Sequence, residues 1–190
     1  MNNIGLFMSY AVMAIFAQNL VLTGGIGASR LIRAARRPKE LFSYSLTVGA
    51  FTLLSSLITY PLSLPFRGTQ AETYLCPLIF TVGVSAVYFA VRVILIRFWG
   101  DMFEKLGQNL NHCAFNGIVF GVPFIAANSG FGFFQTIGFA FGSAIGFMVA
   151  AFLVSEGLRR IDNAEIPRAY RGVPASLLYL GILSLAFSCL

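Results

Sequence analysis

Six apolar runs of about 20 residues each determine what this 190-residue chain can fold into. A helix of that length crosses a hydrocarbon core of roughly 30 Å, so each run predicts one transmembrane helix. The runs are continuous and do not alternate apolar with polar residues, which argues against the strands of a membrane barrel. The predicted spans are Ile4–Thr23, Leu41–Leu64, Tyr74–Ile96, Leu110–Ala127, Phe131–Val154 and Val173–Leu190.

Composition supports the same class of protein. Hydrophobic residues make up 57% of the chain and charged residues only 11%, whereas soluble domains are about 45–50% apolar and about 25% charged. The first run lacks the basic start and the small-residue cleavage site of a signal peptide, so we expect it to be retained as a helix. We therefore predict an all-α integral membrane protein with a single domain over residues 1–190.

The basic residues predict how the chain is oriented. Twelve of the 13 lie in or next to the loops that follow the first, third and fifth spans, and only Arg67 follows the second. Because cytoplasmic loops carry the excess of Lys and Arg, these odd-numbered loops are expected to face the cytoplasm and both termini the opposite side. The net charge of +6 is thus explained by orientation and contact with lipid headgroups, and nucleic acid is not an expected partner.

Two of the predicted spans are interrupted. The first ends in Thr23–Ser29, which holds three glycines within four residues, and the fourth contains Gly117, Gly121 and Pro123. Glycine and proline both weaken a helix, and irregular backbone at membrane depth must be covered by protein or water. Interruptions at matching positions in two three-helix halves indicate an inverted repeat with a site near the midplane. The prediction is an inverted three-plus-three repeat with broken helices one and four.

The best chemical candidate is the cluster Asn111–Ala114, which contains Cys113 and the only histidine, His112. A thiolate can bind iron or another soft metal, but a free cysteine is more often a small buried hydrophobic residue, and both interpretations stay open. Neither a catalytic triad nor a zinc-type cysteine spacing is present in the sequence, and we assign no role to Cys76 or Cys189. Gly138, Gly142 and Gly146 recur at every fourth residue and predict a close-packed helix face.

Four segments resemble the Rnf/Nqr family of membrane subunits, and within it the RnfA and NqrE branch. The last loop and helix are most similar, and the resemblance covers nearly the whole chain. The segments are Ala164–Gly172, Leu180–Phe187, Asn19–Leu22 and the pair Cys113-Ala114.

The resemblance implies a subunit of an ion-translocating electron transport complex in the bacterial inner membrane. Such a subunit has six helices in an inverted repeat, with both termini outside. It pairs with a homologous six-helix subunit of opposite topology, RnfE or NqrD, beside the other Rnf-type subunits. Each partner gives two cysteines to a shared 2Fe–2S centre that carries electrons across the membrane, while ferredoxin, NADH or quinone chemistry drives Na⁺ or H⁺ movement. The chain is not expected to be catalytic alone.

One departure bears on the cofactor. Cys113 matches the second cysteine of the family, but Ser29 stands at the position of the first. A serine hydroxyl stays protonated where a thiol ionises, so the resemblance predicts a divergent member with an altered or absent cluster. The alternative is a small transporter or membrane scaffold on the same fold with no redox metal.

Overall fold

The computed structural model describes residues 2–69, 72–98, 107, 109–161, 167 and 170–188. These residues form α-helices and one short 3₁₀ helix, and no strand occurs among them, which confirms the all-α prediction. The elements are α1 (Asn3–Ile15), α2 (Ala28–Ala35), α3 (Pro38–Ser63), η1 (Leu64–Phe66), α4 (Glu72–Phe98), α6 (Gly117–Asn128), α7 (Phe133–Ile161) and α8 (Val173–Ser188). A further helical segment covers residues 109–114.

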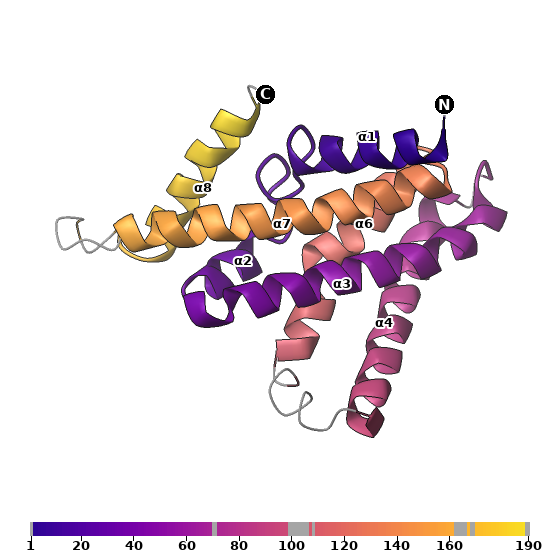
Figure 1. The fold of residues 1–190 in the computed structure, drawn as a ribbon, viewed down its shortest axis with the longest axis horizontal. Coiled ribbons are helices and arrows are strands. Elements are labelled where there is room, and N and C mark those ends of the chain that lie inside the picture. The colour runs from indigo at the N-terminus through magenta and orange to yellow at the C-terminus, as the bar shows by residue number, and fades with distance from the viewer. Residues whose placement is uncertain are drawn as a thin grey trace.

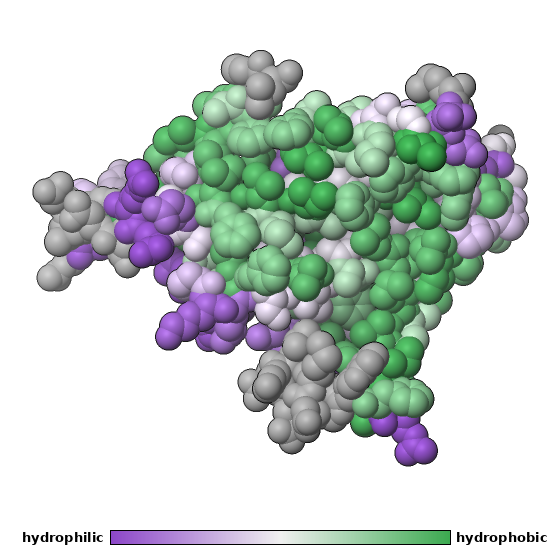
Figure 2. Space-filling view, viewed as in Figure 1, coloured by the Kyte–Doolittle hydropathy of each residue, from purple (hydrophilic) through white to green (hydrophobic). Residues whose placement is uncertain are grey.

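Four helical stretches within the described residues are long and apolar enough to cross a membrane: Pro38–Phe66, Glu72–Phe98, Asn109–Asn128 and Phe133–Ile161. Two more apolar helices, α1 and α8, are shorter. Many large apolar side chains remain exposed on these helices, and Figure 2 shows a broad hydrophobic face with hydrophilic residues toward its ends. The chain is therefore a multi-pass membrane protein.

The long helix α7 organises the bundle. It packs against α1 on one side and α3 on the other, so that the three form a row in Figure 1. The helix α6 packs against α3, α4 and α7. Phe139 and Phe147 of α7 are completely buried, which places the core along this helix. In Figure 1, α4 and α8 diverge from the row.

The predicted glycine face of α7 packs directly against the backbone of α1. A Cβ atom added to Gly138 would collide with the carbonyl group of Phe7, and one added to Gly142 would collide with that of Ala11. A Cβ on Gly146 would lie 3.2 Å from the carbonyl oxygen of Ala14. The close approach predicted from the four-residue spacing is confirmed, and α1 is the helix that approaches.

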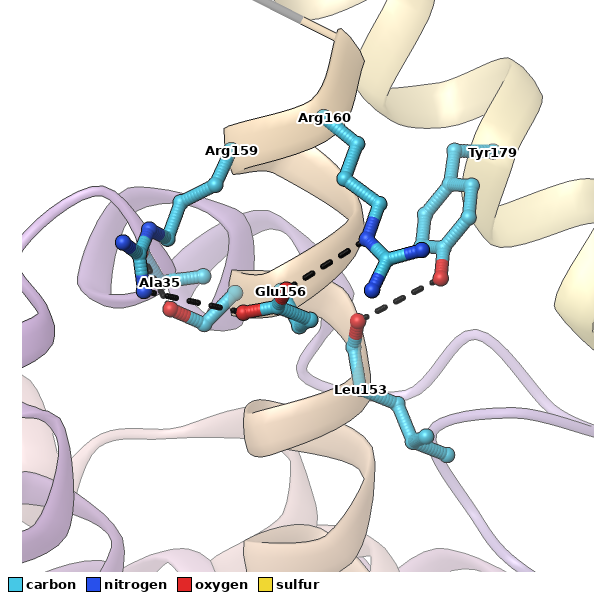
Figure 3. A network of polar contacts seen from close by, with 7 residues as sticks. Ala35, Leu153, Glu156, Arg159, Arg160 and Tyr179 are labelled. Carbon is cyan, nitrogen blue, oxygen red and sulfur yellow. Dashed lines mark hydrogen bonds and ion pairs between the residues drawn. The ribbon is translucent and has the colours of Figure 1, made fainter.

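The C-terminal part of α7 holds α2 and α8 in place (Figure 3). The hydroxyl of Ser155 donates to the carbonyl oxygen of Ala35 at 3.0 Å, and the hydroxyl of Tyr179 donates to that of Leu153 at 3.4 Å. The Tyr179 ring also lies over Gly157, where a side chain would collide with it. Exposed ion pairs join Glu156 to Arg159 at 3.6 Å and to Arg160 at 3.3 Å.

The first interruption begins earlier than the sequence suggested. The prediction carried the helix from Ile4 to Thr23, but α1 ends at Ile15, and turns fill the stretch before α2. We attribute this break to Asn19, because its buried side-chain amide takes the place of the backbone hydrogen bonds that would continue the helix. Its Nδ2 donates to the carbonyl oxygens of Ile15 and Gly146, both at 3.1 Å. Its Oδ1 accepts from the amides of residues 21 and 22 at 3.2 and 3.3 Å. Side-chain bonds of this kind compete with helix continuation.

The second interruption lies immediately before Gly117, the first of the three residues that predicted it. The helical segment 109–114 stops before Phe115, and Asn116 caps the N-terminus of α6, accepting from the amide of Ile118 at 3.4 Å. Gly117 is the first residue of α6, whereas Gly121 and Pro123 lie inside that helix and do not break it. An asparagine cap followed by glycine ends one helix and starts the next, because the side chain satisfies an amide that the new helix leaves free.

Candidate functional site where the two interrupted helices meet

The two interruptions are in contact with each other. Gly27 has φ +82°, a conformation that favours glycine. A Cβ atom on Gly27 would collide with Oδ1 of Asn116. Conversely, a Cβ on Gly117 would lie 3.0 Å from the backbone nitrogen of Gly27. Backbone from the first and fourth predicted spans therefore meets where neither residue carries a side chain.

A buried polar contact ties this junction to α3. The Nδ2 of Asn116 donates to the hydroxyl oxygen of Tyr44 at 3.1 Å, and Asn116 itself is completely buried. The Tyr44 ring lies against Phe147 of α7, with their centroids 6.2 Å apart. The Tyr44 side chain of α3 thus links Asn116 of the fourth span to Phe147 in the core of the bundle.

Cys113 lies just before the second interruption and is buried, with 2% of its surface exposed. Its Sγ is 4.0 Å from the carbonyl oxygen of Tyr44, which makes it a weak donor to the α3 backbone. This environment is that of a packed thiol.

Ser29 lies in a different environment. It is the second residue of α2, is exposed, and lines a cavity of about 430 Å³ between α2, the start of α3 and the segment 109–114. His112 and Tyr44 also line this cavity, and Cys113 is not among its described lining residues. The structure thus brings the elements that carry Ser29 and Cys113 together but turns the two residues to different surroundings.

The cavity is basic. Arg30, Arg33 and Arg37 of the α2 region line it, and Glu40 is the one carboxylate among its described lining residues. The Nη1 of Arg30 donates to the carbonyl oxygen of His112 at 2.8 Å, which joins α2 to the segment 109–114. Glu40 pairs with Arg37 at 3.9 Å, where both side chains are largely exposed.

Comparison with known proteins identifies the family of this chain. The family model described as "Rnf-Nqr subunit, membrane protein" matches residues 7–190. The chain belongs to this family. It is 26% identical to the subunit designated A in the Na⁺-translocating ferredoxin:NAD⁺ oxidoreductase complex of Acetobacterium woodii, over 93% of this chain and 92% of that protein. It is 29% identical to the subunit designated A in the ion-translocating oxidoreductase complex of an Azoarcus species, over 89% and 88%. The subunit designated E in the Na⁺-translocating NADH-quinone reductase of Proteus mirabilis is 24% identical, over 95% and 94%.

The resemblance to the Rnf/Nqr family predicts an iron–sulfur centre. The side chains that could act as ligands test this prediction. No group of three or more His, Cys, Asp or Glu residues that could hold a metal occurs among the described residues. Of the two positions at which the resemblance implies ligands, Cys113 holds a buried thiol and Ser29 an exposed hydroxyl. Iron–sulfur clusters are held mainly by thiolates. The residues present therefore do not fit a centre that takes two thiolates from this chain.

Cys76 packs apart from Cys113, in a separate buried cluster. Cys76 of α4 is buried in a small cluster with Phe80 and Ala127, and Cys189 lies outside the described residues. That neither cysteine is assigned a role stays a prediction from the sequence.

The sequence analysis assigned no structural role to three residues that hold the interruptions: Asn19, Tyr44 and Asn116. A usable signal exists for the two asparagines, since each is an amide within an apolar run, where polar side chains are costly unless they bond to protein. Tyr44 offers no such signal, because tyrosine is common near span ends.

Proposed function

We propose that this chain is an RnfA-like membrane subunit of an ion-translocating oxidoreductase complex, within a bacterial inner membrane. The family match supports the assignment, and the named relatives are subunits of such complexes, so other subunits are implied as partners. The observation that carries the proposal is the contact of the two interruptions at Gly27 and Gly117. Discontinuous helices that meet between two repeats are the arrangement expected of an inverted-repeat membrane site.

The proposed domain holds six spans over residues 1–190 in two inverted halves. In the first half, α1, the turns after it and α2 together make one interrupted span, followed by α3 and α4. In the second half, segment 109–114 and α6 make the interrupted span, followed by α7 and α8. A homologous six-helix subunit of opposite topology, RnfE-like or NqrD-like, is the proposed partner at the junction, and membrane lipid surrounds the rest.

The proposed topology places both termini outside the cytoplasm. It rests on the basic loops after the first, third and fifth spans. We expect a cysteine introduced at Leu190 in a background without native cysteines to react with an impermeant reagent from the outside only. A cysteine at Lys39 is the matched control and should react only after the membrane is opened. Labelling of the Leu190 position from the cytoplasmic side alone would overturn the topology.

Purification from native membranes tests the assignment to a complex. We expect the tagged chain to bring with it a homologous six-helix subunit and flavin- or ferredoxin-type subunits. Alone in mild detergent it should be less stable, because the interrupted helices then lose the protein that covers them. A monodisperse and thermally stable monomer with no co-purifying subunit would contradict the proposal.

Iron content tests what the ligand positions do in that complex. Since this chain offers one thiol at these positions, we expect less iron per complex than a complete centre needs. Ser29→Cys should raise the iron content, Cys113→Ala should lower it to background, and Cys76→Ala should leave it unchanged. If the wild-type complex holds no iron and Cys113→Ala keeps full activity, the chain serves as a transporter or scaffold on this fold without a redox metal.

A further inference from the structure

We propose that the basic cavity at Ser29 binds a phosphate group, from an anionic phospholipid headgroup or from a soluble phosphate ester. The family resemblance predicts half of a metal centre near this position and makes no provision for an anion. The inference comes instead from the charges, donors and size of the cavity.

The positive charge is concentrated on one side of α2. Arg30 and Arg33 are three residues apart on α2, which puts them on one helical face, and Arg37 follows α2 at the start of α3. All three line the cavity. Glu40 offsets one of them, through an exposed pair that contributes little in water. Among the described lining residues the cavity keeps an excess of positive charge, which repels a cation and attracts an anion.

The guanidinium groups of Arg30 and Arg33 have N–H donors available for an anion. Arg30 is fixed by one N–H on the carbonyl oxygen of His112, and a guanidinium has five N–H donors, so its position is set while others stay available. Arg33 has no hydrogen bond or ion pair to any residue that the structure describes, although it lines the same cavity. Guanidinium groups bind phosphate oxygens in pairs of parallel hydrogen bonds, so phosphate matches this donor set.

Neutral donors complete the cavity. The hydroxyl oxygen of Tyr44 accepts from Asn116, which leaves the Tyr44 proton free to be donated elsewhere. Ser29 and Arg30 are the second and third residues of α2, and its N-cap, Gly27, has no side chain to cap their amides. An uncapped helix N-terminus adds N–H groups and a favourable dipole for an anion. The volume of about 430 Å³ accommodates a phosphate with an attached organic group.

The test uses the full-length chain with two probes that separate the sources of phosphate. Inorganic pyrophosphate is titrated calorimetrically into the chain in neutral detergent. Retention of phosphatidylglycerol over phosphatidylcholine is measured by native mass spectrometry after exposure to mixed vesicles. Arg33→Gln is the main variant because Arg33 has no described contact to lose, and Arg30→Gln is the second. Arg159→Gln is the matched control, since it removes the same charge from an exposed pair on α7 (Figure 3).

We expect Arg33→Gln to weaken binding of at least one probe about tenfold, which is the size of one charged hydrogen bond. Arg159→Gln should change neither. Binding of pyrophosphate identifies a soluble phosphate ester as the occupant class, and selective retention of phosphatidylglycerol alone identifies a lipid headgroup. The proposal is overturned if the wild type binds neither probe, or if Arg33→Gln and Arg159→Gln weaken binding equally, which would show an effect of net charge only.

Discussion

Gly142→Leu is expected to prevent assembly of the bundle, with a loss of more than about 3 kcal/mol, at the upper end for overpacking. A Cβ atom at this position already collides with the carbonyl group of Ala11, so even the first carbon of a side chain forces α1 away from α7. The obstacle is backbone, and no change of side-chain rotamer removes it. Because folded domains are stable by about 5–15 kcal/mol, a loss of this size is a large part of the total.

Two control variants distinguish the effect of the collision at Gly142 from the effect of introducing a leucine elsewhere. Phe141→Leu alters the neighbouring residue, which is 41% exposed and touches α1 mainly through the ring of Phe7, so we expect a loss below about 1.5 kcal/mol. Gly181→Leu makes the same substitution on α8, where an added Cβ meets nothing within 4 Å. The measurements are the yield of the chain together with its co-purifying subunits and the thermal unfolding midpoint of that preparation. Equal yields and midpoints for Gly142→Leu and Gly181→Leu would refute the close approach of α1.

Asn19→Leu is expected to lower the thermal unfolding midpoint by roughly 5–15 °C, which corresponds to about 2–4 kcal/mol in a chain of this size. The substitution keeps the number and branching of the side-chain heavy atoms but removes the acceptor for two buried amides, those of Val21 and Leu22. It also removes the donor that ties the first interruption to the carbonyl oxygen of Gly146 on α7. A buried polar group left without a partner costs about 1–3 kcal/mol, and both amides belong to buried residues.

The matched control for this change is Gln18→Leu, which removes an amide from the adjacent, exposed position. It should shift the midpoint by only a few degrees, since exposed substitutions stay within about 0.5 kcal/mol. Asn116→Leu should lower the midpoint by an amount between those of Gln18→Leu and Asn19→Leu. The reason is that the Asn116 side chain makes two hydrogen bonds and the Asn19 side chain makes four. Equal midpoints for Asn19→Leu and Gln18→Leu would show that the first interruption is held by other contacts.

The sequence by itself determined the class of protein, because apolar length is a local property that lipid selects directly. The positions of the long spans follow from it, and the prediction of Leu41–Leu64 ends within one residue of the C-terminal end of α3. The prediction of Phe131–Val154 stops seven residues before α7 ends at Ile161. The packing face of α7 was also predictable, since Gly138, Gly142 and Gly146 carry the helical period in their spacing. The resemblance in the last loop and helix indicated the family.

Only the tertiary structure decided where the helices break and what meets there. Glycine and proline mark weak points in a helix, but Gly121 and Pro123 stayed helical. The breaks lie beside Asn19 and Asn116, whose side chains form hydrogen bonds that depend on neighbours in space. The same holds for the candidate site. The alignment placed Ser29 and Cys113 as a pair, and packing turned Cys113 toward α3 and left Ser29 in a basic cavity with His112 and Tyr44. Such pairings join residues about 70 to 130 positions apart, and no local pattern specifies contacts at that separation.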